Sequence, residues 1–165
     1  MDDGYLRSQH AGKVEEVGEE PTVTSQAGVE LIKQFEGCEL KAYYCPAGIL
    51  TIGYGHTGPD VLPGMTITLE RADAMLVEDL HRFEHAVRTL IEVPFTQHEF
   101  DATVSFTYNV GEGSLKSSTF RRRINKGENK ARCFCEEFPK WVNGAEGPLP
   151  GLVRRRDAEV DLATS

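Results

Sequence analysis

Three side chains that can carry out hydrolytic chemistry lie close together in the sequence. They are Glu36, Cys45 and Thr51, spaced nine and then six residues apart. A carboxyl group that keeps its proton near neutral pH can donate it to a departing oxygen as a general acid. Across a cleft, a thiolate can accept a hydrogen bond from an attacking water, and a hydroxyl can help to hold that water. In inverting glycoside hydrolysis the two facing groups stand roughly 6.5–9.5 Å apart, which leaves room for one water.

The carboxyl group of Glu36 comes at the end of a predicted short helix. Residues 25–37 place apolar side chains on one helical face, with Ser25 or Thr24 as the N-cap and Gly37 as the stop. These apolar side chains are Val29, Ile32 and Phe35. A carboxylate in the last turn meets the negative pole of the helix dipole, which opposes its ionisation. The sequence therefore predicts that Glu36 is suited to hold a proton.

The cysteine and the threonine belong to a predicted β-hairpin that follows this helix. Residues 40–44 and 49–55 are typical of two short strands, and the turn Cys-Pro-Ala-Gly separates them. The glycines that follow predict a close approach of the backbone or a further bend. A hairpin between two lobes normally borders a cleft. We therefore expect four polar side chains along the cleft: Glu36, Cys45, Thr51 and His56.

The rest of the chain is predicted to be mainly helical. Apolar residues in steps of three and four predict a long helix from about residue 68 to residue 93. Thr96 and Glu99 form a capping box that opens a second helix, and Gly111 closes it. Shorter helical patterns cover residues 118–126, 130–138 and 152–162.

Length and composition agree with one catalytic domain preceded by an acidic tail. The chain has 165 residues, of which 39% are hydrophobic and 27% are charged. Residues 1–21 hold six acids and two bases, and thus half of the net charge of −8. We expect residues 1–23 to be a disordered tail and residues 24–165 to form a single domain. The expected fold class is α+β, with a small lobe at about 24–67 and a larger helical lobe at about 68–165.

The same features bound where the protein acts and what it binds. No run approaches the roughly 18 apolar residues of a membrane span, and the N-terminus lacks the basic-then-apolar layout of a signal peptide. We therefore expect a soluble chain with no recognisable export address. The net charge of −8 argues against a protein that binds along the phosphates of a nucleic acid.

The spacing of Glu36, Cys45 and Thr51, followed by the sequence IGYGHT at 52–57, resembles the signature of the phage-type lysozymes, glycoside hydrolase family 24. Further segments are similar to the helical lobe of that family and occur in the same order. They are residues 104–111, residues 116–119, and Trp141 followed by residues 151–156. The resemblance covers about residues 24–160 and implies a lysozyme-like fold.

The resemblance also implies a function. The substrate would be bacterial peptidoglycan, cut at the β-1,4 linkage between N-acetylmuramic acid and N-acetylglucosamine without metal or organic cofactor. Glu36 would be the acid, Cys45 the group beside the attacking water, and Thr51 its helper. Three further residues would bind substrate or line the cleft: His56, Tyr108 and Asn109. The expected protein is a monomer, made in the cytoplasm, that acts on glycan strands of the wall and reaches them by an undetermined route.

A cysteine at the second catalytic position departs from the aspartate that is commoner in the family. It resembles a subset of endolysins that carry an N-terminal signal-anchor-release segment. In that subset a disulfide can trap the catalytic cysteine in an inactive form. The resemblance therefore implies a candidate regulatory disulfide between Cys38 and Cys45, although the apolar anchor itself is missing from this sequence.

Each assignment has a structural alternative. Glu36 could be a solvent-facing helix acid, Cys45 a buried thiol, and Thr51 a residue chosen for a strand. The arginine triplets at 121–123 and 154–156 could cover solvated helix faces or bind the carboxylates of peptidoglycan stem peptides. Three tyrosines could stack on sugar rings or simply alternate along a half-buried hairpin: Tyr43, Tyr44 and Tyr54.

Other kinds of site and function are less consistent with the sequence. A zinc site built from Cys38, Cys45 and His56 lacks a fourth ligand at a usual spacing. Cys133 and Cys135 lie two apart on a predicted helix and point to different faces, which fits ordinary core or surface thiols. The alternative function is a peptidoglycan-binding or toxin-carrier module that keeps a lysozyme-like fold with little catalysis.

Overall fold

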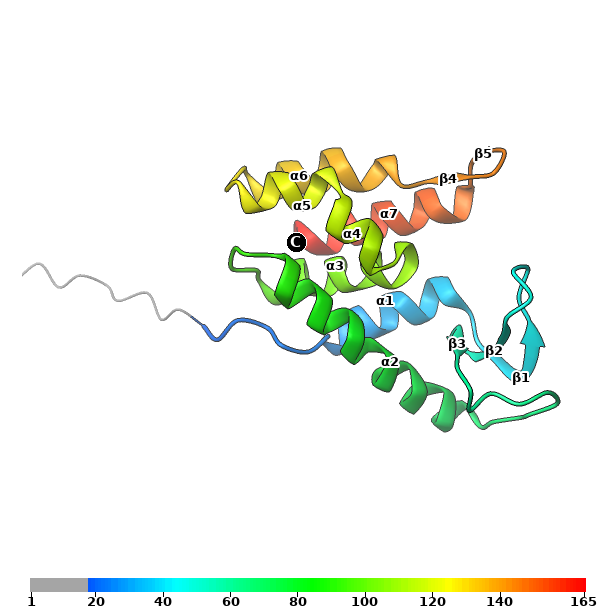
Figure 1. Cartoon of the computed structure of the whole chain (residues 1–165). Helices are drawn as coiled ribbons and strands as arrows, with labels where there is room; N and C mark the ends of the chain where they lie inside the picture. Colours follow the sequence, from blue (N-terminus) through cyan, green and yellow to red (C-terminus); the bar gives the residue numbers. More distant parts are fainter. Residues whose placement is uncertain (1–17) are drawn as a thin grey trace, which may run out of the picture.

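The structure is a computed structural model that describes residues 18–165 (Figure 1). Its helices are α1 (Gln26–Glu36), α2 (Leu69–Leu90), α3 (Gln97–Val110), α4 (Glu112–Ser117), α5 (Thr119–Asn125), α6 (Lys130–Glu137), the 3₁₀ helix η1 (Phe138–Lys140) and α7 (Pro150–Ala163). Its strands are β1 (Glu39–Tyr44), β2 (Leu50–Gly53), β3 (His56–Thr57), β4 (Asn143–Gly144) and β5 (Gly147–Pro148). Most of the expected tail, residues 1–17, lies outside the described residues.

The strands β1, β2 and β3 form one antiparallel sheet in sequence order. Glu39 pairs with Gly53 and Tyr43 pairs with Thr51, with a register irregularity between Glu39 and Tyr43. In Figure 1 this sheet lies at the right-hand end of the molecule, apart from most of the helices, and α2 runs from it into the helical part. The sheet and the helices therefore form two parts that meet where α1 ends and α2 begins.

Local sequence signals explain where the main helices start and stop. Gly37 ends α1 with φ of +67°, a backbone conformation that favours glycine. The hydroxyl of Thr68 caps α2 by accepting a hydrogen bond from the backbone N–H of Arg71 at 3.1 Å. Both halves of the predicted capping box at Thr96 and Glu99 are present, which confirms the predicted start of α3.

The main hydrophobic core lies among the helices. Its centre is a group of fully buried aromatic rings from α3, α5, α6 and η1: Phe106, Phe120, Phe134 and Phe138. The rings of Phe106 and Phe138 stack with their centroids 4.3 Å apart. A second, smaller cluster packs β2 against α2 through Ile52, Val61 and Met75. Because α2 contributes to both clusters, it fixes the sheet relative to the helical part.

The observed elements confirm the α+β class, and they add elements that the sequence did not predict. The strand β3, the helix α4 and the two-residue strands β4 and β5 were not expected from the sequence patterns. The helix α1, which the sequence groups with the small lobe, packs against α3 and α7 of the helical part. The end of α1 therefore places its last residue, Glu36, where the two parts meet.

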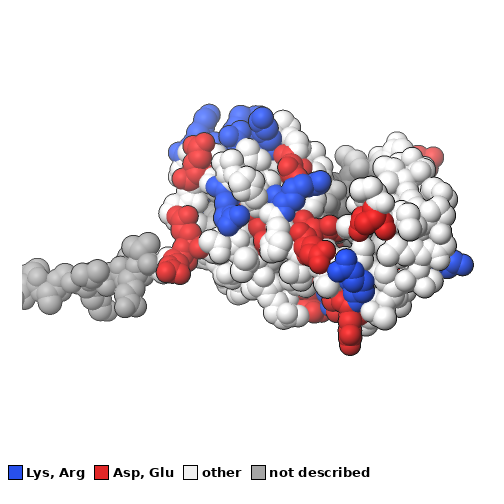
Figure 2. Space-filling model, turned by 60° about the horizontal axis from the view of Figure 1, so that its bottom comes forward, with Lys and Arg blue, Asp and Glu red and all other residues white. Residues whose placement is uncertain are grey.

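The surface charge is unevenly distributed. Figure 2 shows the side of the molecule that lies below in Figure 1, where Lys and Arg side chains gather along the upper edge and Asp and Glu side chains dominate the middle.

Within the described residues, none of the helices combines the length and the apolar character that a membrane crossing requires.

Candidate active site

The carboxylate of Glu36 lies where three surface hollows meet. One hollow, of about 340 Å³, lies between the β2–β3 turn, α2 and the end of α3, and Gly55, Asp79 and Tyr108 are among its lining residues. A second, of about 430 Å³, runs along the start of β1 past Cys38. A third, of about 440 Å³, opens between α1 and the start of α7. One half-buried carboxylate thus faces open space on several sides, as an acid that must reach a bound polymer requires.

A buried arginine holds one oxygen of this carboxylate. Nη1 of Arg155, on α7, lies 2.5 Å from Oε1 of Glu36. Arg155 is only 3% exposed, and it also donates from Nη2 to the backbone oxygen of Ser105 at 3.1 Å and from Nε to Glu159 at 3.2 Å. The hydroxyl of Ser105 donates to the same oxygen of Glu159 at 2.7 Å. Arg155 is therefore a positioning residue, whose rigid fork is anchored by Ser105 and Glu159 before it reaches Glu36.

The second buried arginine completes this network. Arg156 pairs with Glu159, donates to the side-chain oxygen of Asn109, and donates from Nε to the backbone oxygen of Trp141 at 3.0 Å. Burial raises the pKa of the Glu159 carboxyl, and the two arginines beside it oppose that rise. The two buried arginines are thus paired with two carboxyl groups, those of Glu36 and Glu159. A buried guanidinium without such a partner would be strongly destabilising.

The other oxygen of Glu36 faces the first hollow. A Cβ atom built on Gly55 would lie 3.9 Å from both Oε2 of Glu36 and the hydroxyl of Tyr108, and φ of Gly55 is +90°. The hydroxyl of Tyr108 donates to the backbone oxygen of Tyr54 at 2.7 Å, which ties α3 to the β2–β3 turn. Because Arg155 occupies Oε1, the oxygen that can carry a transferable proton is Oε2.

Cys45 and Thr51 come together at the tip of the β1–β2 hairpin. The backbone N–H of Cys45 donates to Ile49 at 2.9 Å, and the hydroxyl of Thr51 donates to the backbone oxygen of Ile49 at 2.9 Å. The pKa of the Cys45 thiol is lowered, chiefly by a hydrogen bond from the backbone of Ile49. Burial is the next largest effect and opposes this lowering, while hydrogen bonds from Ala47, Thr51 and Gly48 add to it. The turn therefore favours the thiolate that the predicted role of Cys45 requires.

A strand separates the two cysteines of the candidate regulatory disulfide, which we call the latch. Cys38 and Cys45 are both free thiols and stand just before and just after β1. Seven extended residues span roughly 20 Å, whereas a disulfide requires Cα atoms within about 7 Å. A bond between these two cysteines is therefore incompatible with β1 as folded. The latch stays a prediction, and it requires a second conformation in which β1 is opened.

His56 joins the sheet to α2 through one carboxylate and to the loop after β3 through another. Its Nδ1 lies 2.8 Å from Asp79 on α2, and its Nε2 lies 3.0 Å from Asp60. Burial opposes protonation of the ring, but the hydrogen bonds and charges of Asp79 and Asp60 outweigh it, so the pKa of His56 is raised. This geometry fits a structural role beside the cleft. Asp79 lines the same hollow as Glu36, whereas His56 is not among the residues that line it.

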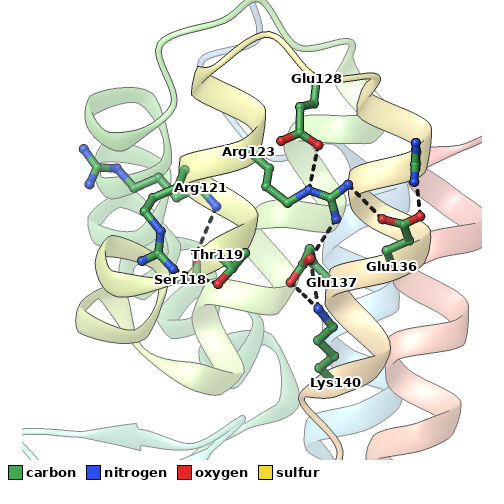
Figure 3. Close-up of polar contacts among 10 residues, drawn as sticks. Ser118, Thr119, Arg121, Arg123, Glu128, Glu136, Glu137 and Lys140 are labelled. Carbon is green, nitrogen blue, oxygen red and sulfur yellow. Dashed lines mark hydrogen bonds and ion pairs between the residues drawn. The ribbon is translucent and has the colours of Figure 1, made fainter.

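Two interpretations of the arginines and tyrosines need correction. The triplet 154–156 does not lie on a solvated face, because Arg155 and Arg156 are buried. Of the triplet 121–123, Arg123 pairs with three acidic side chains of the segment 128–137, as Figure 3 shows. Tyr54 is only 6% exposed and packs in the core, so stacking on sugars is left to the exposed Tyr43 and Tyr44.

The remaining predicted site residues lie near Glu36. Tyr108 lines the first hollow with it, and Asn109 lines the third. Sequence patterns missed Arg155, Glu159 and Asp79. The signal that could have identified the first two is the Arg-x-x-x-Glu spacing, which places an ion pair on one helical face next to an apolar face. Within residues 18–165, no group of three His, Cys, Asp or Glu side chains is arranged to hold a metal ion.

Solved structures of similar fold define the class to which this fold and site correspond. The muramidase domain of SpmX from Asticaccaulis excentricus matches with a TM-score of 0.80 and 37% identity, over 88% of this chain and 99% of that chain. The active form of the P1 phage endolysin matches with a TM-score of 0.73 and 30% identity, over 85% and 84% of the two chains. Its secreted inactive form matches with a TM-score of 0.54 and 27% identity. The fold is that of a lysozyme.

The sequence comparisons then identify the family. The family model described as phage lysozyme matches residues 33–159, and an endolysin of Acyrthosiphon pisum secondary endosymbiont phage 1 is 43% identical over 86% of this chain and 97% of its own length. An endolysin of Bacillus phage PZA is also 43% identical, and the chain spans 55% of its length. The chain belongs to the phage lysozyme family.

Proposed function

We propose that this chain is a muramidase in which Glu36 acts as the general acid and Cys45 and Thr51 hold the attacking water. The family, the endolysin relatives and the lysozyme fold make the protein a glycoside hydrolase that lyses bacterial peptidoglycan. The observation that carries the residue assignment is the position of Glu36, whose one oxygen is anchored by Arg155 while the other faces an open hollow.

The proposed step accounts for each proton. Oε2 of Glu36 donates its proton to the glycosidic oxygen as the bond from that oxygen to C1 of N-acetylmuramic acid breaks. A water held at the hairpin tip attacks C1 from the opposite face and passes a proton to the Cys45 thiolate. The products are a new reducing end and a free 4-hydroxyl on N-acetylglucosamine. Exchange with solvent then returns the proton to Glu36 and removes the proton from Cys45.

Several features support the role of the hairpin tip. The lowered pKa of Cys45 increases the thiolate fraction available near neutral pH. The hydroxyl of Thr51 has a single proton, which can be donated to the backbone oxygen of Ile49 or to the sulfur of Cys45, and in either case its oxygen lone pairs can accept a hydrogen bond from water. Thr51 is only 4% exposed, so packing restricts the positions that its side chain can take.

Analysis of the products tests the proposal. Purified peptidoglycan digested with the wild-type protein should yield fragments that end in reducing N-acetylmuramic acid, identified by borohydride reduction and mass spectrometry. The first-formed anomer, followed by NMR on a soluble glycan strand, should be inverted. Reducing N-acetylglucosamine ends or a retained anomer would contradict the proposed chemistry. Binding to walls with no release of reducing ends would favour the binding module instead.

A further inference from the structure

One stretch of this acidic chain carries only positive charge. Residues 116–126 contain five basic residues and no acidic residue, whereas the whole chain has a net charge of −8. The five lie on α4, on α5 or directly after α5, and they are Lys116, Arg121, Arg122, Arg123 and Lys126. A concentration of one charge on neighbouring helices attracts a partner of the opposite charge. This stretch is therefore a candidate surface for an anionic segment.

Only Arg123 of the five is neutralised within the fold. It pairs with three acidic side chains, and Figure 3 shows Arg121 pointing from α5 away from that network. Within residues 18–165, no carboxylate lies within 4 Å of the other four basic groups. Three of these four side chains are exposed, and Arg121 is half-buried. We call these four residues the cationic surface: Lys116, Arg121, Arg122 and Lys126.

Two guanidinium groups of the cationic surface are held in place by neutral acceptors. Arg121 donates to the backbone oxygens of Leu90 and Lys116, both at 3.1 Å. Arg122 donates to the backbone oxygen of Ser117 at 2.8 Å. These acceptors carry no net charge, so both arginines keep an uncompensated positive charge while they lose part of their conformational freedom. Binding an anion therefore costs them less entropy than it costs a mobile side chain.

The described chain starts beside the end of α2 that this surface contacts. Residues 20–22 share an apolar hollow of about 120 Å³ with residues of α2 and of the loop after it, among them Arg88. The backbone N–H groups of Thr24 and Ser25 donate to carboxylates of α2 and α3 at 2.8 Å and 2.9 Å. The cationic surface reaches the same end of α2 through the hydrogen bond to Leu90. In Figure 1 the start of the described chain (blue), the loop after α2 and the turn between α5 and α6 all lie at the left-hand end.

Four carboxylates come directly before this anchored segment. They lie within residues 15–20, which we call the acidic block, and they are Glu15, Glu16, Glu19 and Glu20. Glu15 and Glu16 precede the described residues, whereas Glu19 and Glu20 are described and exposed. An extended chain spans roughly 3.3 Å per residue, so residue 15 lies within about 20 Å of residue 21. A helix is roughly 10 Å wide, so the block is long enough to pass the end of α2 and reach α5.

We propose that the acidic block binds the cationic surface of the same chain. Four carboxylates then meet four cations that lack acidic partners within residues 18–165, and Arg88 adds a fifth cation where the block joins the described fold. A single exposed ion pair is weak, but covalent attachment keeps the block at a high effective concentration, so several weak pairs suffice. Glu92, an exposed acid in the loop after α2, opposes the contact with one charge.

Zero-length crosslinking tests the contact in the full chain. A carbodiimide joins a carboxylate to a lysine amine only where the two groups touch. At low salt, mass spectrometry of the monomeric product should find the acidic block joined to Lys116 or Lys126. At about 0.5 M NaCl the yield should fall at least about fivefold, because salt screens exposed charges. Lys41 is the matched control, since it is exposed and lies on β1 at the opposite end in Figure 1, and it should form no crosslink to the block.

Substitution of one exposed arginine tests the dependence on charge. Arg122→Gln should lower the yield of crosslinks to Lys116 and Lys126 about threefold, since one of the four cations is lost. Lys41→Gln should leave that yield unchanged. Circular dichroism checks that both variants are folded. An unchanged yield in a folded Arg122→Gln protein, or an equal loss in Lys41→Gln, would overturn the proposal.

Other occupants of the surface would give different results. If crosslinks to the acidic block appear only in a dimeric product, a second copy supplies the carboxylates and the proposal is wrong. If no crosslink to the block forms at low salt, the surface is left to an external anion and the proposal is wrong as well. Both outcomes leave the muramidase assignment untouched, because the experiment contains no substrate. Wrong hydrolysis products from a protein that forms the crosslink would refute that assignment alone.

Discussion

The guanidinium of Arg155 lies 2.5 Å from Oε1 of Glu36, and 119 residues of chain separate the two. The proposed general acid is thus fixed by a helix near the C-terminus as well as by its own helix. Because Arg155 is itself held by Ser105 and Glu159, the orientation of Glu36 depends on the packing of α3 against α7. The catalytic hairpin and the helical part must therefore fold together before the site is complete.

Replacement of Arg155 should reduce catalysis more than substrate binding. In Arg155→Lys the charge remains, but the fork that bridges Glu36, Glu159 and Ser105 is lost, so we expect kcat to fall about 10- to 100-fold with a small change in KM. Arg155→Met removes the cation between the buried Glu159 and the half-buried Glu36. This variant should therefore destabilise the fold by about 3–5 kcal/mol. Steady-state kinetics measures kcat and KM for Arg155→Lys, and urea unfolding measures the free energy of unfolding for Arg155→Met. Wild-type kcat in a folded Arg155→Lys protein would refute the positioning role.

Cys45 should tolerate a carboxylate better than a hydroxyl. Its proposed role is that of an anion beside water, so Cys45→Asp should keep activity within about tenfold of wild type, whereas Cys45→Ser should lose about 100-fold or more. Cys135→Ser, which changes an exposed cysteine on α6, is the control and should be neutral. The release of reducing ends is measured for all three. If the Asp variant is folded and inactive, the chemistry depends on sulfur itself.

His56 should make stability depend on pH in a defined direction. Its pKa is raised in the folded protein, so its contribution is complete below the unfolded value of about 6.5 and is lost as the pH rises through the folded value. The pKa of Asp60 is lowered by the same contact, so the contribution of Asp60 is complete above its unfolded pKa and is lost as the pH falls through the folded value. The stability difference between wild type and His56→Gln should thus shrink above pH 6.5.

Urea unfolding at a series of pH values measures that difference. His85→Gln, an exposed histidine on the same helix as Asp79, is the control and should show no such trend. A stability difference for His56→Gln that stays constant from pH 5 to pH 9 would mean that the ring is not held as a cation between Asp60 and Asp79.

The predicted latch between Cys38 and Cys45 has a structural cost that can be measured. Because β1 separates the two thiols, oxidation should close the bond only where β1 opens, and closure should lower the β content and abolish activity together. Mass spectrometry of the oxidised protein identifies the bond, and circular dichroism follows the strand. If the disulfide forms while β1 and the activity persist, the placement of β1 is wrong. If both thiols stay free under oxidant, there is no latch.

The sequence predicted the elements whose signals are local. The capping box at Thr96, the glycine stop at Gly37 and the hairpin turn after Tyr44 depend on a few neighbouring residues, and all three are present. The short helix α4 and the strand β3 were missed, because pieces of two to six residues have no periodicity that stands out. Their formation depends on tertiary packing.

The sequence singled out Glu36 as the candidate acid, but it did not reveal the side chains that hold Glu36 in place. Glu36 was identified by its spacing to Cys45 and Thr51, which is a local pattern. Arg155 appeared to belong to a charged surface triplet, since periodicity within one short helix does not show which face its neighbours will cover. Burial of Arg155 and Arg156 follows from the packing of α3 on α7, which connects residues some 50 positions apart.

Substitution of the acid tests the central claim most directly. Glu36→Gln keeps the shape and a hydrogen bond to Arg155 but cannot donate the proton, so release of reducing ends from purified peptidoglycan should fall by at least about 1,000-fold while the protein stays folded. Glu30→Gln, an exposed acid on the same helix, should retain wild-type activity. Hydrolysis by a folded Glu36→Gln protein at a rate near that of wild type would contradict the assignment of Glu36 as the general acid.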